Sequence, residues 1–389
     1  MNIALVHDYL REYGGAERVV EALHEMWPEA PLYTSFVDWP SLAKAPAGKV
    51  ELFKSMDIRT SWVEHVWLVK KLISPLRFLA PMIWGSFNLS GYDVVISSSG
   101  WFMCRGVSIK KPAVHISYIH HPPRNLYGYA TGSDWQKYPI VRIYGAIVNF
   151  FLRHYDFETA QAVDYFVANS KETARRVKKF YRRESTVIYP PVEISKGLAL
   201  KTRPQGKALR KQDYFLSVGR LTWAKRIDLA IEACNKLKLP LKIVGTGKEE
   251  EYLRSIAGPT VEFLGSVSDE ELSRLYLGAK ALIFCALDED FGMVPVEAMA
   301  AGVPVIALAQ GGVVETVVDG ETGVLFREPT VECLVEGIKR WEDSKTGRWE
   351  QNCRKQAQKF SKERFKKELK AFVEHHLDDI RHTTYNKGI

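Results

Sequence analysis

The chain has 389 residues, a length that predicts two or three domains rather than one. Apolar residues make up 46% and charged residues 26%, an ordinary balance for a soluble protein with hydrophobic cores. The net charge of +8 comes without any nucleic-acid-binding motif and from locally clustered basic residues, so a nucleic-acid partner is excluded.

The chain begins MNIALVHDYL, which lacks the basic start of a secretory signal and predicts a first β-strand. The five cysteines are scattered without metal-ligand spacing, which favours a reducing compartment and no disulfide framework. The apolar stretches at 62–87 and 139–152 are broken or too short for the roughly 20 residues that cross a bilayer. We therefore expect a cytoplasmic protein.

The first half of the chain alternates predicted strands and helices. Ala16, Val19, Val20 and Leu23 recur at helical spacing directly after the first predicted strand, 2–6. Further predicted strands lie at 32–37, 50–53, 93–97, 114–119, 164–168 and 186–189. The basic segment 195–212 has little periodicity and is predicted to be a linker.

A second series of the same kind follows this linker. Strands are predicted at 214–218, 241–244, 261–264, 281–285 and 303–308, with helical patterns between them. Strands that alternate with helices indicate a mainly parallel sheet covered on both sides. The sequence therefore predicts an α/β protein with two Rossmann-like domains, 1–194 and 213–360.

Two glutamates mark the end of the predicted strand 281–285. Glu289 follows the strand, and Glu297 lies eight positions later, one turn into a predicted helix. The backbone N–H groups between them belong to Phe291, Gly292, Met293 and Val294. A helix N-terminus behind a glycine favours phosphate, and carboxylates accept hydrogen bonds from sugar hydroxyls. This pattern predicts a site for a molecule that carries both phosphate and sugar.

Arg220 and Lys225 follow the first predicted strand of the second series. Because open α/β sheets bind ligands at the carboxyl ends of their strands, we expect both cations to converge with Glu289 on one site. Arginine makes planar contacts with phosphate oxygens and lysine supplies a compact charge. Gly245 and Gly247 follow the next strand, where we expect them to allow close backbone approach beneath a nucleotide.

Glu289-x7-Glu297, with Gly292, Pro295, Ala298 and Met299, resembles the signature of retaining nucleotide-sugar glycosyltransferases of GT-B family 4 (group 1). The longer runs EDFGMVPVEAMAAGVPVIA and GGVVETVVDGETGVLF resemble bacterial O-antigen and exopolysaccharide mannosyltransferases. The resemblance implies two Rossmann-like domains that face an interdomain cleft. It also implies that domain 1–194 lies on the acceptor side and that the terminal helix 361–389 crosses back onto it.

The resemblance also implies roles for the residues of the second domain. Arg220 and Lys225 would hold the donor diphosphate, Glu289 would contact the donor sugar, and Glu297 would bind the ribose. Asp288-Glu289-Asp290 contains the Asp-x-Asp metal motif of another transferase fold. Because the arginine and the lysine already supply positive charge for the leaving group, we expect neither a metal nor another cofactor.

In the first domain, Gly14 and Gly15 separate the first strand from its helix and are expected near the donor phosphate and the acceptor. The segment YIHHPPR at 118–124 resembles the Cys-His-Thr-Pro-x-Arg segment of the family. Ile119 replaces its cysteine and His121 its threonine, and His120 matches its histidine. We favour His120 over His121 as the residue that faces the donor sugar.

Two more residues of this domain, Asp8 and Arg124, are candidates to orient the acceptor, although a structural role fits them equally. The Trp-rich stretch 62–87 and the basic stretch 171–183 are each expected either to contact an anionic membrane surface or to be an ordinary part of the fold. Such contact would put the protein on the inner face of the cell membrane.

We therefore expect a retaining hexosyltransferase, with mannose from GDP-mannose as the favoured donor and a lipid-linked saccharide of bacterial surface polysaccharide synthesis as acceptor. UDP-glucose and UDP-N-acetylglucosamine are the alternative donors. A sugar-nucleotide 2-epimerase is the rival activity, because it shares the two-domain architecture.

Overall fold

The computed structural model describes residues 2–43, 45–46, 48–131, 138–194, 213–344 and 348–385, without the side chains of 378–385. Contacts divide the chain into two units. The first unit comprises Met1–Gly128, Gln136–Pro191 and Lys362–Ile389, and the second comprises Tyr129–Trp135 and Val192–Ser361. The predicted linker 195–212 lies outside the described residues, so the domain boundaries predicted beside it stay a prediction.

In the described part of the chain, the sheet of the first unit has seven parallel strands in the order β3-β2-β1-β4-β5-β6-β7. The strands are β1 Ile3–His7, β2 Leu32–Thr34, β3 Ile58–Thr60, β4 Val94–Ser99, β5 Val114–Ile119, β6 Tyr165–Ala168 and β7 Thr186–Val187. β1, β4 and β5 are buried along their whole length, as expected for strands covered on both faces.

Helices cover both faces of this sheet. They are α1 Gly15–Met26, α2 Trp39–Leu42, α3 Lys49–Ser55, α4 Trp67–Lys71, α5 Ala80–Gly85, α6 Arg124–Tyr127, α7 Pro139–Ala162, α8 Lys171–Tyr181 and α17 Lys362–Tyr385. Three 3₁₀ turns join them: η1 Trp62–His65, η2 Arg77–Leu79 and η3 Cys104–Gly106. Leu5 of β1 packs with α1 and α17, while Val6 packs with α5 and α7, because successive strand residues point to opposite faces.

The terminal helix α17 belongs to the first unit, where its apolar side chains join the core beneath α1. Its first residue, Lys362, donates hydrogen bonds to Glu21 at 3.0 Å and to Glu25 at 2.6 Å. Both carboxylates come from α1. Apolar packing and charge pairing therefore both attach α17 to the first sheet.

The second unit repeats the architecture. Its described strands form a six-stranded parallel sheet in the order β10-β9-β8-β11-β12-β13. They are β8 Phe215–Val218, β9 Leu241–Val244, β10 Val261–Gly265, β11 Leu282–Phe284, β12 Val305–Leu308 and β13 Gly323–Phe326. Its helices are η5 Trp223–Lys225, α10 Ile227–Leu237, α11 Glu250–Ser255, α12 Asp269–Gly278, α13 Met293–Ala300, α14 Val313–Thr316, α15 Val331–Asp343 and α16 Trp349–Gln358.

The predicted fold class is confirmed, since each unit is a Rossmann-like α/β layer structure with a parallel sheet. The strand predicted at 50–53 is wrong, because these residues belong to α3. Gly48, with φ 81°, starts this helix in a left-handed conformation, and the apolar Val50 and Phe53 lie three apart on it. Within the described residues, no helix combines the length and apolar character that a bilayer crossing requires.

Candidate active site

Lys225 and Glu289 meet in the second unit at the point where the strand order reverses, between β8 and β11. The Nζ atom of Lys225 lies 2.6 Å from Oε2 of Glu289, and the two side chains are 25% and 17% exposed. A topological switch point of this kind is where open α/β sheets bind ligands. The structure therefore brings together the predicted cation and the predicted acid at the expected edge of the sheet.

Backbone contacts hold the two loops in this position. Leu287 N, in the loop after β11, donates to Ala224 O of η5 at 2.8 Å, one residue before Lys225. Asp288 adopts a left-handed φ of 50°, which turns the chain toward Glu289. The ion pair is thus fixed by its backbone as well as by its charges.

Gly311 and Gly312, which the sequence-based prediction left without a role, support the loop of Glu289 from behind. A Cβ atom on Gly311 would lie 2.1 Å from the carbonyl oxygen of Glu289, and one on Gly312 would lie 2.3 Å from that of Asp290. Gly312 N also donates to Glu289 O at 2.8 Å. A glycine pair between a strand and a helix was the available signal, and it is the same signal that singled out Gly14 and Gly15.

Gly245 and Gly247 have a direct steric reason to be glycine. A Cβ atom on Gly245 would lie 1.9 Å from Gly219 O, and one on Gly247 would lie 2.2 Å from Leu221 O. The backbone they accommodate is the loop after β8, which also carries the exposed Arg220. These glycines therefore position the loop of Arg220 and Lys225, and their contact with a nucleotide stays a prediction.

Helix α13 begins at Met293, after Gly292 with a left-handed φ of 89°. Among the described side chains, none caps this N-terminus, so the first N–H groups, which include that of Val294, have no capping side chain. The ring of Phe291 is buried against Phe360 at 5.4 Å between centroids. Phe291 can therefore serve a ligand only through its backbone.

Glu297 receives a hydrogen bond from Tyr276, a residue for which the sequence analysis predicts no role. The hydroxyl of Tyr276, in α12, donates to Oε2 of Glu297 at 3.2 Å. Tyr276 itself is buried. A single tyrosine in an amphipathic helix carries no local signal of such a contact, which only the tertiary structure creates.

The flanking acids of the Asp-x-Asp segment have different surroundings. The carboxylate of Asp288 accepts hydrogen bonds from Ala130 N at 2.9 Å and from Gln310 Nε2 at 3.2 Å, both within the second unit. Asp290 is buried at 8% exposure. Protein donors thus engage Asp288, while the expectation of a metal-independent site remains a prediction.

In the first unit, the strand order reverses between β1 and β4, and Asp8 lies at that point. Its carboxylate accepts hydrogen bonds from three backbone N–H groups, those of Gly100 at 3.0 Å and of Phe102 and Cys104 at 2.9 Å each. Asp8 is 7% exposed. This geometry gives Asp8 a structural role in shaping the loop after β4, and its predicted contact with the acceptor stays a prediction.

A hydrogen-bonded chain leads from His120 into the core. Its Nε2 lies 2.8 Å from Ser98 Oγ, and that hydroxyl lies 3.2 Å from Nδ1 of His7. Nε2 of His7 lies 3.5 Å from the buried Glu17, whose other oxygen accepts from Gly14 N at 2.9 Å. This relay connects the candidate histidine to the loop of Gly14 and Gly15.

The relay changes the titration of its buried histidine. Burial alone would lower the pKa of His7, but the hydrogen bond and the charge of Glu17, the charge of Asp8 and the carbonyl of Ser98 outweigh it. The net result is a raised pKa. His7 stands out only as the polar residue of an apolar strand, and Glu17 is one of several charged residues in α1, so the sequence analysis predicts no role for either.

His121 lies beside His120 at the end of β5. Its Nδ1 is 3.0 Å from Pro122 O, and a Cβ atom on Gly100 would lie 3.6 Å from its Nε2 and 3.9 Å from Cβ of His120. Both histidines therefore flank Gly100. Arg124 begins α6 close behind them.

Comparison with known proteins supplies the family. The model for glycosyl transferases group 1 matches residues 200–360, and the model for Glycosyltransferase Family 4 matches residues 13–196. Together the two models leave only the chain ends and a three-residue gap unmatched. The chain belongs to the GT-B glycosyltransferases.

This glycosyltransferase is similar to curated proteins over part of their length. It is 28% identical over 204 residues to the D-inositol 3-phosphate glycosyltransferase of Nocardioides sp., covering 43% of each chain. It is 34% identical over 150 residues to the alpha-1,3/1,6-mannosyltransferase ALG2 of Dictyostelium discoideum, covering 32% of this chain and 36% of the relative. The chain also spans only 34% and 58% of two further matched relatives, so it covers less than two thirds of the curated relatives' own length.

A solved structure agrees over nearly the whole chain. HepE of Anabaena, crystallised in complex with UDP-glucose, superposes with a TM-score of 0.67 at 18% identity, covering 96% of this chain and all of HepE. At this identity the similarity establishes the GT-B fold.

Proposed function

We propose that the protein is a retaining glycosyltransferase that moves a hexose from a nucleotide sugar to a saccharide acceptor. The ion pair of Lys225 and Glu289 at the switch point of the second sheet carries this proposal. The N-terminus of α13, beside Glu289, adds the partial positive charge of a helix end. Cation, helix end and acid together suit a sugar diphosphate.

In the proposed reaction the bond between the sugar C1 and the diphosphate oxygen breaks, and its electron pair stays on the diphosphate. The acceptor hydroxyl bonds to C1 on the same face and passes its proton to the departing phosphate. Glycosyl transfer of this kind has an oxocarbenium-like transition state. Lys225, Arg220 and the N–H groups of α13 would stabilise the negative charge that develops on the leaving group.

The glutamates would orient the donor. Glu289 would accept hydrogen bonds from the hexose hydroxyls while Lys225, which has three N–H donors, contacts both the carboxylate and the phosphate. Glu297 would accept a hydrogen bond from the ribose, and the Tyr276 hydroxyl fixes the direction of its carboxylate.

We assign the remaining roles to the first unit. His120 would contact the donor sugar, with its ring orientation set by Ser98, and the Gly14–Gly15 loop would approach the donor phosphate. Arg124 and Asp8 stay candidates for orienting the acceptor.

We favour GDP-mannose as donor, on the similarity to a mannosyltransferase and on the resemblance to O-antigen and exopolysaccharide mannosyltransferases. UDP-glucose, the ligand of HepE, and UDP-N-acetylglucosamine are the alternatives. A lipid-linked saccharide of bacterial surface polysaccharide synthesis is the proposed acceptor, and the cytoplasm is the proposed location.

Thermal shift measurements with GDP-mannose, UDP-glucose and UDP-N-acetylglucosamine test the proposal. A nucleotide sugar that binds only the folded state raises stability by about 2.7 kcal/mol at a hundred times its Kd. We expect GDP-mannose to give the largest shift and Lys225→Ala to remove most of it. Lys236→Ala, on the exposed side of α10, is the matched control. Shifts that are the same for all three donors and for Lys225→Ala would argue against a donor site at Lys225.

The epimerase rival is tested separately. Isomerised sugar nucleotide that forms in the absence of any acceptor would support it, whereas a transferase releases free hexose or no product under the same conditions.

A further inference from the structure

Helix α7 carries apolar side chains on both of its faces. The inward face includes the buried Val148 and Leu152. The outward face presents Ile140, Ile143, Ile147 and Phe150, with exposures of 83%, 64%, 57% and 66%. These residues recur at spacings of three and four, which places them in one stripe. A helix on the surface of a soluble protein normally turns polar residues outward, so this stripe requires a separate explanation.

Polar contacts fix the rotation of α7 about its axis. Asp156 pairs with the fully buried Arg105 and accepts a hydrogen bond from the Tyr127 hydroxyl at 2.7 Å. About two turns earlier in the helix, the side chain of Asn149 donates a hydrogen bond to Asn125 O at 3.0 Å. Because these partners lie on the inward face, the helix cannot roll to bury its outer stripe.

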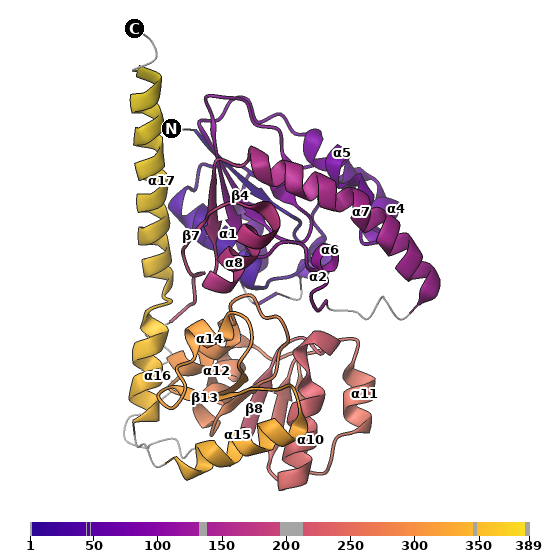
Figure 1. Ribbon diagram of the computed structural model, residues 1–389, viewed down its shortest axis with the longest axis vertical. Coiled ribbons are helices and arrows are strands. Elements are labelled where there is room, and N and C mark those ends of the chain that lie inside the picture. The colour runs from indigo at the N-terminus through magenta and orange to yellow at the C-terminus, as the bar shows by residue number, and fades with distance from the viewer. Residues whose placement is uncertain are drawn as a thin grey trace. The chain divides into compact units, whose positions relative to one another are not determined.

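A second apolar segment lies beside α7. The exposed side chains of Trp67, Leu68, Phe78 and Met82 come from α4, η2 and α5. The Tyr144 hydroxyl of α7 donates to Pro75 O, and Arg77 of η2 donates to Asn149 Oδ1 at 2.5 Å. Figure 1 shows α4, α5 and α7 on the same side of the first unit. We call the stripe of α7 together with these four residues the α4–α7 surface.

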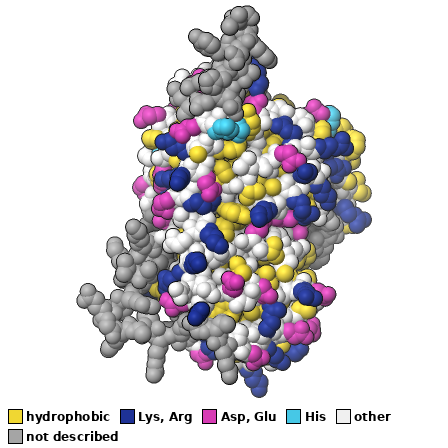
Figure 2. All heavy atoms as spheres, turned by 60° about the vertical axis from the view of Figure 1, so that its left-hand side comes forward, with side chains coloured by type: hydrophobic (Ala, Val, Ile, Leu, Met, Phe, Trp, Pro, Cys, Tyr) yellow, Lys and Arg dark blue, Asp and Glu magenta, His cyan; other side chains and the backbone are white. Residues whose placement is uncertain are grey.

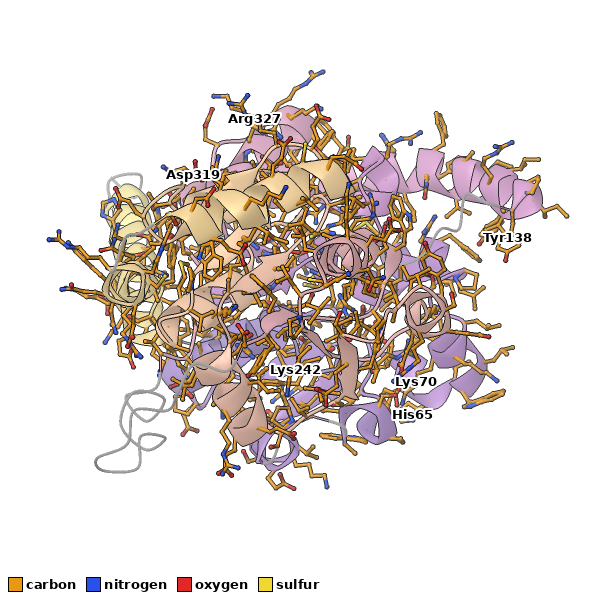
Figure 3. The ribbon with its side chains drawn as sticks, turned by 90° about the horizontal axis from the view of Figure 1, so that it is seen from below. His65, Lys70, Tyr138, Lys242, Asp319 and Arg327 are labelled. Atoms are coloured by element: carbon orange, nitrogen blue, oxygen red, sulfur yellow. The ribbon has the colours of Figure 1, made fainter. Side chains whose placement is uncertain are left out.

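The charges around this surface are mainly positive. Residues 65–92 and 138–155 contain Lys70, Lys71, Arg77, Arg142 and Arg153 and no acid. The acids next to these ranges are Glu64, which pairs with Lys70 at 2.6 Å, Asp93, the buried Asp156 and the exposed Glu158 at the far end of α7. Lys71 lies with its Nζ 5.1 Å from the Trp67 ring centre, and Tyr138 lies at the outer end of α7 (Figure 3). By contrast, the face in Figure 2 mixes acidic and basic side chains. Aromatic and aliphatic groups among cations suit an anionic interface.

We propose that the α4–α7 surface docks the protein on the anionic face of a lipid bilayer. The isoleucines and phenylalanines of α7 would enter the boundary between headgroups and acyl chains, with Trp67 and Tyr138 at headgroup level. Lys71, Arg142 and Arg153 would contact lipid phosphates. This proposal does not rest on the donor chemistry and is tested by lipid binding alone.

The observations favour a membrane over a second copy of the chain as the partner of this surface, and they favour the α4–α7 surface over α8 as the part that contacts the membrane. In a symmetric dimer the same patch faces itself, so the excess of cations on one copy would meet the same excess on the other. The basic helix α8 is the other sequence-predicted candidate for membrane contact. All of α8 is described, and none of its apolar side chains is exposed; Arg175 and Arg176 both pair with Glu172. Helix α8 therefore lacks the exposed apolar side chains that an interfacial helix inserts, and its contact with a membrane stays a prediction.

Co-sedimentation of the full chain with vesicles tests the proposal. We expect binding to vesicles of phosphatidylcholine with phosphatidylglycerol, weaker binding to phosphatidylcholine alone, and weaker binding as salt rises. Ile140→Ser with Phe150→Ser should weaken vesicle binding by about tenfold or more, because it removes exposed apolar anchors. Lys71→Glu with Arg142→Glu should weaken binding to the anionic vesicles by at least about fivefold.

Tyr252→Ser, in α11 of the second unit, removes an aromatic side chain that is 50% exposed and should leave vesicle binding unchanged. An unchanged thermal melt and donor-induced shift will show that the variants are folded. The proposal is overturned if the wild-type protein binds neither vesicle type, or if the Ile140→Ser/Phe150→Ser variant binds as well as wild type. It is also overturned if that variant instead abolishes a dimer seen by size-exclusion chromatography.

Discussion

Lys225 and Glu289 lie 64 residues apart in the sequence, yet their side chains meet at 2.6 Å. An ion pair at the switch point of a parallel sheet holds a cation where a phosphate binds and an acid where a sugar binds. Substituting Lys225 or Glu289 separately would measure what the cation and the acid each contribute to the reaction.

Lys225→Ala is expected to lower the turnover of donor by about 100- to 1000-fold, the typical effect of removing one preorganised group that stabilises a leaving group. The loss should appear in both KM and kcat, because Lys225 contacts the diphosphate of the bound donor and this interaction strengthens as charge develops on the leaving group. Steady-state kinetics with the preferred donor provides the measurement. The control, Lys236→Ala, should retain wild-type kinetics, and a Lys225→Ala enzyme that does the same would exclude the assigned role.

Gly311→Ala is expected to destabilise the second unit by about 1–3 kcal/mol and to weaken donor binding, because the new methyl group would lie 2.1 Å from Glu289 O. Gly320→Ala is the matched control, since Gly320 has a similar left-handed φ of 76° but nothing within 4 Å of an added Cβ. Urea unfolding and donor titration separate the two effects. Equal losses for both variants would mean that backbone conformation alone, not the contact with the Glu289 loop, requires glycine.

The relay from His120 to Glu17 predicts a pH-dependent stability. Because the folded-state pKa of His7 is raised above 6.5, its contribution is fully present below pH 6.5 and is lost as pH rises through the folded value. His7→Gln should remove this dependence from the free energy of unfolding. The same slope in wild type and variant above pH 6.5 would assign the dependence to other groups.

Ser98→Ala tests the relay at its centre. The substitution removes the hydroxyl that contacts both His7 and His120, so we expect a shifted pH profile of kcat with a smaller change in KM. Ser98→Thr keeps a hydroxyl at this position and should restore part of the profile. If Ser98→Ala leaves the pH profile unchanged, the Ser98 hydroxyl does not couple His7 to His120.

The lowered pKa of Glu21 predicts that acid weakens the attachment of α17 to α1. Burial alone would raise its pKa, but hydrogen bonds from Lys49, Tyr13 and Lys362 lower it from 4.5 to about 2. Its contribution is therefore present above pH 4.5 and is lost as pH falls toward 2, with a value of roughly 1–2 kcal/mol at neutral pH once solvent screening of the charges is included. Glu21→Gln should lose much of this, measured by chemical unfolding at neutral pH.

The control for this variant is Glu374→Gln. Glu374 pairs with Lys370 at 3.9 Å on the exposed side of α17, where ion pairs contribute little. A Glu21→Gln protein as stable as Glu374→Gln would show that packing alone attaches α17.

Most strands and the glycosyltransferase signature were predictable because both are local patterns, whereas the short strand β3 lies outside every predicted strand. β5 was predicted at its observed bounds from an apolar run, and Glu289 was selected because a strand end and a helix start lie on either side of it. The prediction of a strand at 50–53 was wrong because a short apolar run fits a helix as well as a strand.

Other features depend on partners distant in sequence. Tyr276 acquires its importance from Glu297, and His7 from Glu17 and Ser98, so no periodicity identifies them. The outward stripe of α7 was hidden for a different reason. A helix that is apolar on both faces has the composition of a buried helix, and only the inward anchors Asn149 and Asp156 show which side is exposed.

The three backbone N–H groups that converge on Asp8 have a consequence for ligand affinity. The loop after β4 is ordered when the sheet forms, through a carboxylate that belongs to the neighbouring strand. A ligand that reaches the two histidines beside Gly100 therefore finds a rigid wall and loses no binding free energy to freezing it. Tightness of binding in this unit should depend on the fit of the ligand rather than on the flexibility of the protein.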